Sequence, residues 1–111
     1  MKLVIPPEYQ IGAHTYRIRV NNLALDVAEL RAKVSYNDQI IRISTHLDGQ
    51  PRSNSMMFEA LLHEILHPIN HLFMGGELTE AQHEQIAAGF AQALTSLGIE
   101  PDFSQIPKEE L

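Results

Sequence analysis

Hydrophobic and polar residues alternate along the first half of the chain. In residues 14–20, Tyr16, Ile18 and Val20 lie on one face and polar side chains lie on the other. This period of two predicts a strand with one buried face. Residues 23–32 follow with a pattern that fits a short helix as well as a strand.

Two candidate strand segments, residues 33–36 and 39–44, flank the pair Asn37-Asp38. A two-residue link of turn-forming residues is common between antiparallel strands, so we expect a β-hairpin here. Residues 48–51, with the sequence Asp-Gly-Gln-Pro, interrupt any regular structure. The first half of the chain therefore predicts a small, mainly antiparallel sheet.

The period changes at Asn54, and the second half of the chain predicts two helices. From Asn54 to the glycine pair at residues 75–76, hydrophobic residues recur every three or four positions, as on the buried face of a long helix. Residues 79–82 have the T-x-x-Q form of a capping box. A second helix is therefore expected to begin at Glu80 and to end before Gly98.

These elements predict one α+β domain over residues 1–111, in which a small sheet precedes two packed helices and residues 100–111 form an irregular C-terminal tail. A chain of 111 residues has room for a single core. The net charge of −6 and the absence of cysteine argue against a nucleic-acid surface, disulfides and thiolate chemistry. The chain lacks a membrane-spanning run and a signal-peptide pattern, so we expect a cytoplasmic protein.

Four of the six histidines, at positions 63, 67, 71 and 83, lie within 21 residues. His63 and His67 form an HExxH motif with Glu64 inside the first long helix. Residues four apart share a helix face, so both imidazoles can reach one zinc ion. Glu64 can then act as the general base on the metal-bound water. The motif therefore predicts a zinc-dependent hydrolase with Glu64 as its catalytic group.

A catalytic zinc site needs a third protein ligand and one open position. The metzincin pattern is absent, because Asn70 and Phe73 stand where it requires Gly and His. His71 would lie about 12 Å from His63 along a continuous helix, a separation that a kink at Pro68 would reduce.

The second helix offers two further candidates for the third ligand, His83 and Glu84. The hydrophobic pattern directs His83 towards the buried face of that helix. If the two helices instead meet along flanking stripes, Glu84 is favoured. The pattern alone leaves both residues open.

Two stretches of the chain resemble the small HExxH proteins of phages, prophages and archaea, which include the minimal gluzincin metallopeptidases (minigluzincins). They are residues 61–67 (LLHEILH) and residues 78–87 (LTEAQHEQIA), and residues 33–43 are similar to the hairpin that precedes the motif helix in such proteins. The second helix of that family carries a glutamate ligand in the pattern L-[ST]-E-x-x-x-E-x-[IL]-A. That glutamate maps onto Glu84.

The resemblance implies a zinc-dependent metallopeptidase that holds one zinc ion per chain through His63, His67 and Glu84. Glu64 would serve as the general base, and the substrate would be a peptide or protein. We expect an extended substrate to pair with the exposed edge of the strand at residues 39–44. No nucleic-acid or membrane partner is expected.

The chain departs from the family pattern at Pro68, where a helix former is expected, and at His83, where an apolar residue is usual. The resemblance also implies latency, in which residues 100–111 of this chain or of a neighbouring copy cover the site. One alternative is a non-catalytic phage or prophage accessory protein with a structural zinc site that His71 or His83 closes. A third interpretation is a helical interaction module without metal.

Overall fold

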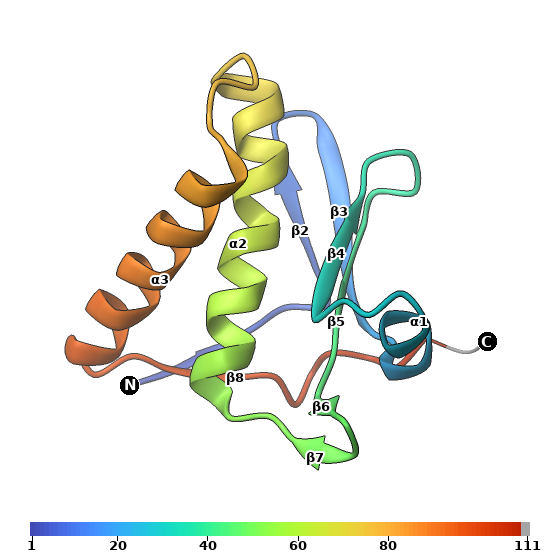
Figure 1. Cartoon of the computed structure of the whole chain (residues 1–111). Helices are drawn as coiled ribbons and strands as arrows, with labels where there is room; N and C mark the ends of the chain where they lie inside the picture. The colour runs from blue at the N-terminus through green and yellow to red at the C-terminus, as the bar shows by residue number, and fades with distance from the viewer. Residues whose placement is uncertain (110–111) are drawn as a thin grey trace.

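The computed structural model describes residues 1–109, and Figure 1 shows the arrangement of their elements. In chain order, the elements are β1 (Lys2–Val4), β2 (Glu8–Ile11), β3 (His14–Val20), α1 (Asn22–Val27), β4 (Ala32–Ser35), β5 (Ile40–Ile43), β6 (His46–Leu47), β7 (Gln50–Pro51), α2 (Asn54–Phe73), α3 (Glu80–Ser96) and β8 (Glu100–Asp102). The fold is α+β, with a small mixed sheet and two packed helices, as the sequence predicts. None of the helices in residues 1–109 is long and apolar enough to cross a membrane.

The main sheet has four strands in the order β2-β3-β5-β4. The predicted strand is β3, and the predicted hairpin is β4 and β5, which pair antiparallel. β3 and β5 pair in parallel, and the chain between them, which contains α1 and β4, provides the crossover that parallel strands need. The prediction that residues 39–44 offer an exposed edge is wrong, since β5 has a neighbour on each side. The free edges of this sheet belong to β2 and β4.

The segment whose pattern fits both a helix and a strand contains the helix α1. Its N-terminus is capped by Asn21, whose side chain accepts a hydrogen bond of 3.0 Å from the backbone N–H of Ala24. A side-chain acceptor at this position satisfies one of the free N–H groups of a first helical turn. The cap therefore favours a helix over a strand in this segment.

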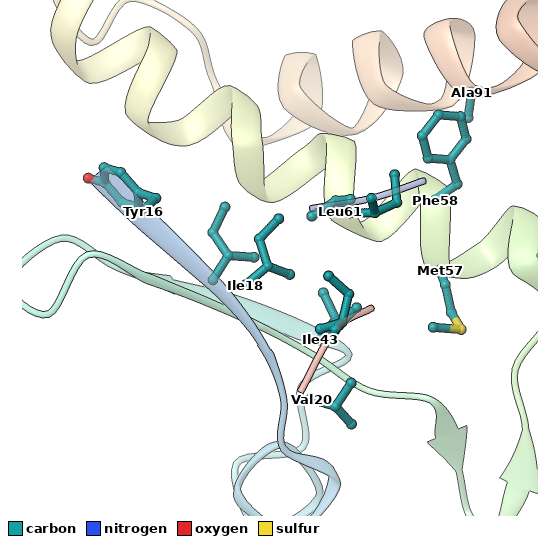
Figure 2. Packing of buried hydrophobic residues seen from close by; sticks show 11 residues of the cluster. Tyr16, Ile18, Val20, Ile43, Met57, Phe58, Leu61 and Ala91 are labelled. Carbon is teal, nitrogen blue, oxygen red and sulfur yellow. The ribbon is translucent and has the colours of Figure 1, made fainter. Parts of the chain in front are cut away.

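The hydrophobic core lies between the sheet and α2. Ile18 and Ile43 project from the sheet, and Phe58 and Leu61 project from α2, and each of these side chains is at most 2% exposed. In Figure 2, Ile18 and Ile43 point from the sheet towards α2 and Leu61, and the ring of Phe58 extends towards Ala91 of α3. α2 thus lies between the sheet and α3 (Figure 1). The second helix therefore meets α2 on the side away from the sheet.

α2 is one unbroken α-helix, although it contains Pro68. Ser53 caps its N-terminus by accepting a hydrogen bond from the backbone N–H of Met56. The predicted capping box is present at the start of α3, where Thr79 and Gln82 each accept a hydrogen bond from the backbone of the other. Both helices therefore begin where the sequence predicts.

The C-terminal segment is more regular than the sequence predicts. β8 pairs in parallel with β1, and Ile106 is buried in the core. Further on, the carboxylate of Glu109 accepts hydrogen bonds from Arg42, at 2.7 and 2.9 Å, and from the side chain of Asn21, at 2.8 Å. These contacts fix residues 100–109 against β1 and the ends of β3 and β5. Residues 110–111 lie outside the described residues.

Candidate metal centre

α2 and α3 bring two imidazoles and one carboxylate together. His63 and His67 lie one turn apart on α2, and Glu80 is in the first turn of α3. Oε1 of Glu80 lies 2.6 Å from Nε2 of His63, and Oε2 lies 3.3 Å from Nε2 of His67. Within residues 1–109, these three side chains are the group of metal-ligating type whose donor atoms all lie within 4.8 Å of one another.

The turn between α2 and α3 places Glu80 beside the two histidines. Gly75 and Gly76 take positive φ angles of 63° and 72°, which glycine adopts without steric strain. The buried side chain of Asn70 then binds the backbone of Leu78 twice. Its Nδ2 donates to the carbonyl at 3.3 Å, and its Oδ1 accepts from the N–H at 3.1 Å. Asn70 therefore fixes the start of α3 against the end of α2.

This role of Asn70 does not follow from the hydrophobic pattern of the chain. In the sequence, Asn70 is a polar residue between the apolar positions Ile69 and Leu72 of a predicted helix, a few positions before a glycine pair. A buried amide normally has hydrogen-bond partners, so a turn anchor is a reasonable interpretation of such a residue. The identity of the partner depends on the path of the turn, which the pattern does not contain.

The electrostatics of the site favour a neutral imidazole at His67. Burial lowers the pKa of this side chain, and the neighbouring His83 lowers it further, while Glu80 acts in the opposite direction. The lowered pKa favours the neutral imidazole, which is the form that binds a metal ion. At His63, the 2.6 Å contact to Glu80 is a hydrogen bond in which the ring Nε2–H donates to the carboxylate.

Glu64 is the buried carboxyl group of the site. Its side chain is 8% exposed, and this burial raises its pKa to about 7. Glu80 also raises the pKa, whereas His63 and a backbone hydrogen bond from Val34 lower it. A carboxyl group that exchanges its proton near neutral pH is suited to general acid–base chemistry. The position and the environment of Glu64 therefore fit the role that the motif predicts.

Glu84, the predicted third ligand, is not in the cluster. It lies one turn beyond Glu80 on α3, its side chain is exposed, and it lines the cavity next to the site. The structure thus brings Glu80, rather than Glu84, to the two histidines. Glu80 and Glu84 lie on the same face of α3. Which of the two carboxylates reaches the histidines therefore depends on the position of α3 along the axis of α2.

The other two candidates lie close to the site in different ways. His71 is exposed on the next turn of α2, and its ring packs against Tyr36 with centroids 5.2 Å apart. His83 is buried, with its ring stacked on that of His67 at a centroid distance of 4.2 Å. Neither residue belongs to the group whose donor atoms converge within 4.8 Å.

A cavity of about 580 Å³ opens beside His63 and Glu80. Its walls come from the segment between α1 and β4, from the first half of α2 and from the first turns of α3. Most of its charged residues are acidic, namely Glu29, Glu59, Glu64, Glu80 and Glu84. The site is therefore reached from a hollow of the size of a small-molecule or peptide pocket.

Comparisons of the chain with known protein families, with curated proteins and with solved structures found no match. The assignment of the site therefore depends on its own geometry. Two imidazoles and one carboxylate are a donor set of catalytic zinc sites, in which a water takes the fourth position. His63, His67 and Glu80 fit such a centre in residue type and in spacing.

Proposed function

We propose that the protein is a zinc-dependent metallopeptidase. The observation that supports this most strongly is the convergence of His63, His67 and Glu80 beside the buried carboxyl group of Glu64. The HExxH motif predicts the first two ligands and the general base, and the fold supplies a carboxylate from a second helix. Zinc in such a site lowers the pKa of a bound water and polarises the carbonyl of the substrate.

Different residues of the site would bind the metal and transfer the proton. His63, His67 and Glu80 would hold the metal through two Nε2 atoms and one carboxylate. Glu64 would take the proton of the attacking water and pass it to the leaving amine. Burial of Glu64 supports this role, because it keeps the affinity of the carboxylate for a proton high at neutral pH.

The substrate would lie along the cavity and the edge of β4. Val34 of β4 provides a backbone hydrogen bond to Glu64, which places this edge strand next to the proposed general base. The outer edge of a strand can pair with an extended peptide through main-chain hydrogen bonds. A peptide on β4 would therefore pass the metal site with its backbone in a fixed register. Nucleic-acid and membrane partners are not part of this proposal.

The test combines metal analysis with a role-separating variant. The purified protein is expected to contain about one zinc per chain. Glu64→Gln should keep the zinc and lose hydrolysis of a mixed peptide pool, because an amide cannot accept the proton of the water. Glu77→Gln, at an exposed position of the α2–α3 turn, is the matched control and should match the wild type. Absence of bound zinc, or full activity in Glu64→Gln, would contradict the proposal.

A non-catalytic accessory protein with a structural zinc ion is the second candidate function. It is favoured by one observation, the buried imidazole of His83 beside His67, because a fourth protein ligand closes a tetrahedral site. Zinc binding without peptidase activity, in both the wild type and Glu64→Gln, would support this candidate. The cytoplasmic location and the phage or prophage relation belong to both proposals.

A further inference from the structure

His83 carries a buried ring nitrogen without a hydrogen-bond partner. Within residues 1–109, such side-chain atoms are Oη of Tyr9, Nε of Arg52 and Nε2 of His83. His83 is the one among them that contacts the metal-ligating group, and it is only 2% exposed. A buried nitrogen without a hydrogen-bond partner is destabilising. We therefore expect Nε2 of His83 to have a partner, and this nitrogen lies beside the metal-ligating group.

The other ring nitrogen of His83 fixes the tautomer. Nδ1 lies 2.8 Å from the backbone carbonyl of Thr79. A carbonyl only accepts hydrogen bonds, so Nδ1–H must donate, and the neutral ring carries its free lone pair on Nε2. Metal-binding histidines have this arrangement, in which one ring N–H donates to a backbone carbonyl and the other nitrogen binds the ion.

The ring centroids of His63, His67 and His83 lie about as far apart as those of imidazoles that bind one ion. Their ring centroids lie 5.2 Å apart for His63 and His67, 5.9 Å for His63 and His83, and 4.2 Å for His67 and His83. Zinc binds an imidazole nitrogen at about 2.0–2.1 Å, which places the ring centroids of two ligands at a tetrahedral angle about 5 Å apart. Two of the observed centroid distances are longer than this value, and the distance between His67 and His83 is shorter.

We propose that Nε2 of His83 is an additional ligand of the metal ion, so that His63, His67, His83 and Glu80 form one centre. This inference rests on the metal site of the proposed function. The planes of His67 and His83 lie 22° apart, too nearly parallel for both nitrogens to point at one ion. Binding of both nitrogens to one ion therefore requires the ring of His67 or that of His83 to rotate.

The coordination number then decides what the centre can do. Four protein ligands fill a tetrahedral zinc site and leave no place for a water, as in structural centres. A five-coordinate ion with the same four ligands keeps one position for a water and remains compatible with hydrolysis. His83 therefore links the ligand set to the choice between the two candidate functions.

Zinc affinity of the full chain is measured by competition with a chromophoric chelator. His83→Leu and His83→Gln should each weaken binding by more than about a hundredfold, which exceeds the usual effect of removing a residue that only orients a ligand. His71→Gln, which removes an imidazole on α2 outside the cluster, is the control and should leave the affinity nearly unchanged. Circular dichroism checks that each variant is folded, and His83→Gln serves if the leucine variant is not.

Zinc K-edge X-ray absorption of the wild type gives an answer that does not depend on any variant. Three imidazoles per zinc are expected, falling to two in His83→Gln. Two imidazoles in the wild type, or unchanged affinity in both His83 variants, would overturn the role of His83 while leaving the proposed function in place. Three imidazoles in a protein without peptidase activity would support His83 and overturn the peptidase instead. Absence of zinc binding would overturn both.

Discussion

Glu80 is an exposed residue whose carboxylate nevertheless contacts two imidazoles. Its side chain is 64% exposed, whereas those of His63 and His67 are 15% and 22% exposed. Each carboxylate oxygen faces a different ring nitrogen, so the group is oriented before an ion is present. Such preorganisation reduces the entropy that ligand binding must overcome.

The first prediction separates the two carboxylates of α3. Glu80→Gln should weaken zinc binding by more than about tenfold, because it removes an anionic oxygen from the group that converges. Glu84→Gln changes an exposed residue outside that group and should leave the affinity close to that of the wild type. Competition titration of both variants measures the difference.

The opposite result would be equally informative. If Glu84→Gln loses zinc and Glu80→Gln keeps it, the assignment from the family resemblance is right. In that case α3 must shift or turn against α2 when the ion binds, because Glu84 lies outside the group of donor atoms that converge. Until this is measured, the ligand role of Glu84 stays a prediction.

At the scale of the elements, the long and strongly periodic segments could be predicted from the sequence. β3, the β4–β5 hairpin, α2 and α3 each carry a local pattern, with caps at Ser53 and Thr79. The strands β1, β6, β7 and β8 have two or three residues each, too few for a period to show. β1 and β8 exist because chain segments far apart in sequence pair with each other.

The residues of the candidate site also differ in how far the sequence alone could predict them. HExxH is a local motif, so His63, Glu64 and His67 could be named from their spacing alone. The third ligand depends on the register of one helix against another, which no local pattern contains. That register is set by the turn between α2 and α3, and in particular by Asn70.

The second prediction tests this turn. Asn70→Ala removes both hydrogen bonds to the backbone of Leu78 and leaves the Leu78 groups without these partners. The free energy of unfolding of the metal-free protein should fall by about 1 to 3 kcal/mol. Zinc affinity should also fall, because the start of α3 is no longer fixed. Chemical denaturation and competition titration give the two values.

Asn70→Asp is the isosteric companion of this variant. An aspartate can still accept from the N–H of Leu78, but its second oxygen faces the carbonyl that Nδ2 of Asn70 contacts. Because this carboxylate is buried and, among the described residues, has no cation beside that carbonyl, the loss of stability at pH 7 should be at least as large as in the alanine variant. A wild-type zinc affinity in Asn70→Ala would show that the turn does not govern the position of Glu80.

At the scale of the whole molecule, the C-terminal segment acts as part of the fold. β8 pairs with β1, Ile106 joins the core, and Glu109 binds Arg42. No hydrogen bond or ion pair joins residues 100–109 to the side chains of His63, His67 and Glu80. A truncation after residue 98, which would test latency in a protein with a free tail, would here remove structural contacts. Latency through the C-terminus stays a prediction that such a truncation cannot isolate.

The last prediction uses the pH dependence of the Glu109 contact. Hydrogen bonds from Arg42, in the first place, lower the pKa of Glu109 to about 2, and Asn21 adds to the effect. Because the folded state lowers this pKa, the ionised carboxylate stabilises the fold above the ordinary pKa of about 4.5. The stabilisation is lost as the pH falls from there towards 2.

Glu109→Gln should therefore lower the free energy of unfolding by about 1 kcal/mol at pH 7, a modest value because the ion pair is partly exposed to solvent. The difference from the wild type should shrink between pH 4.5 and pH 3, because the carboxyl group of Glu109 takes up a proton there in the unfolded wild type while it stays ionised in the folded state. Urea denaturation at several pH values measures both curves, with Glu77→Gln as the exposed control. A difference that stays constant down to pH 3 would mean that the carboxylate contributes through packing rather than through its charge. If the variant and the wild type are equally stable at pH 7, the Arg42 contact does not hold the C-terminal segment in place.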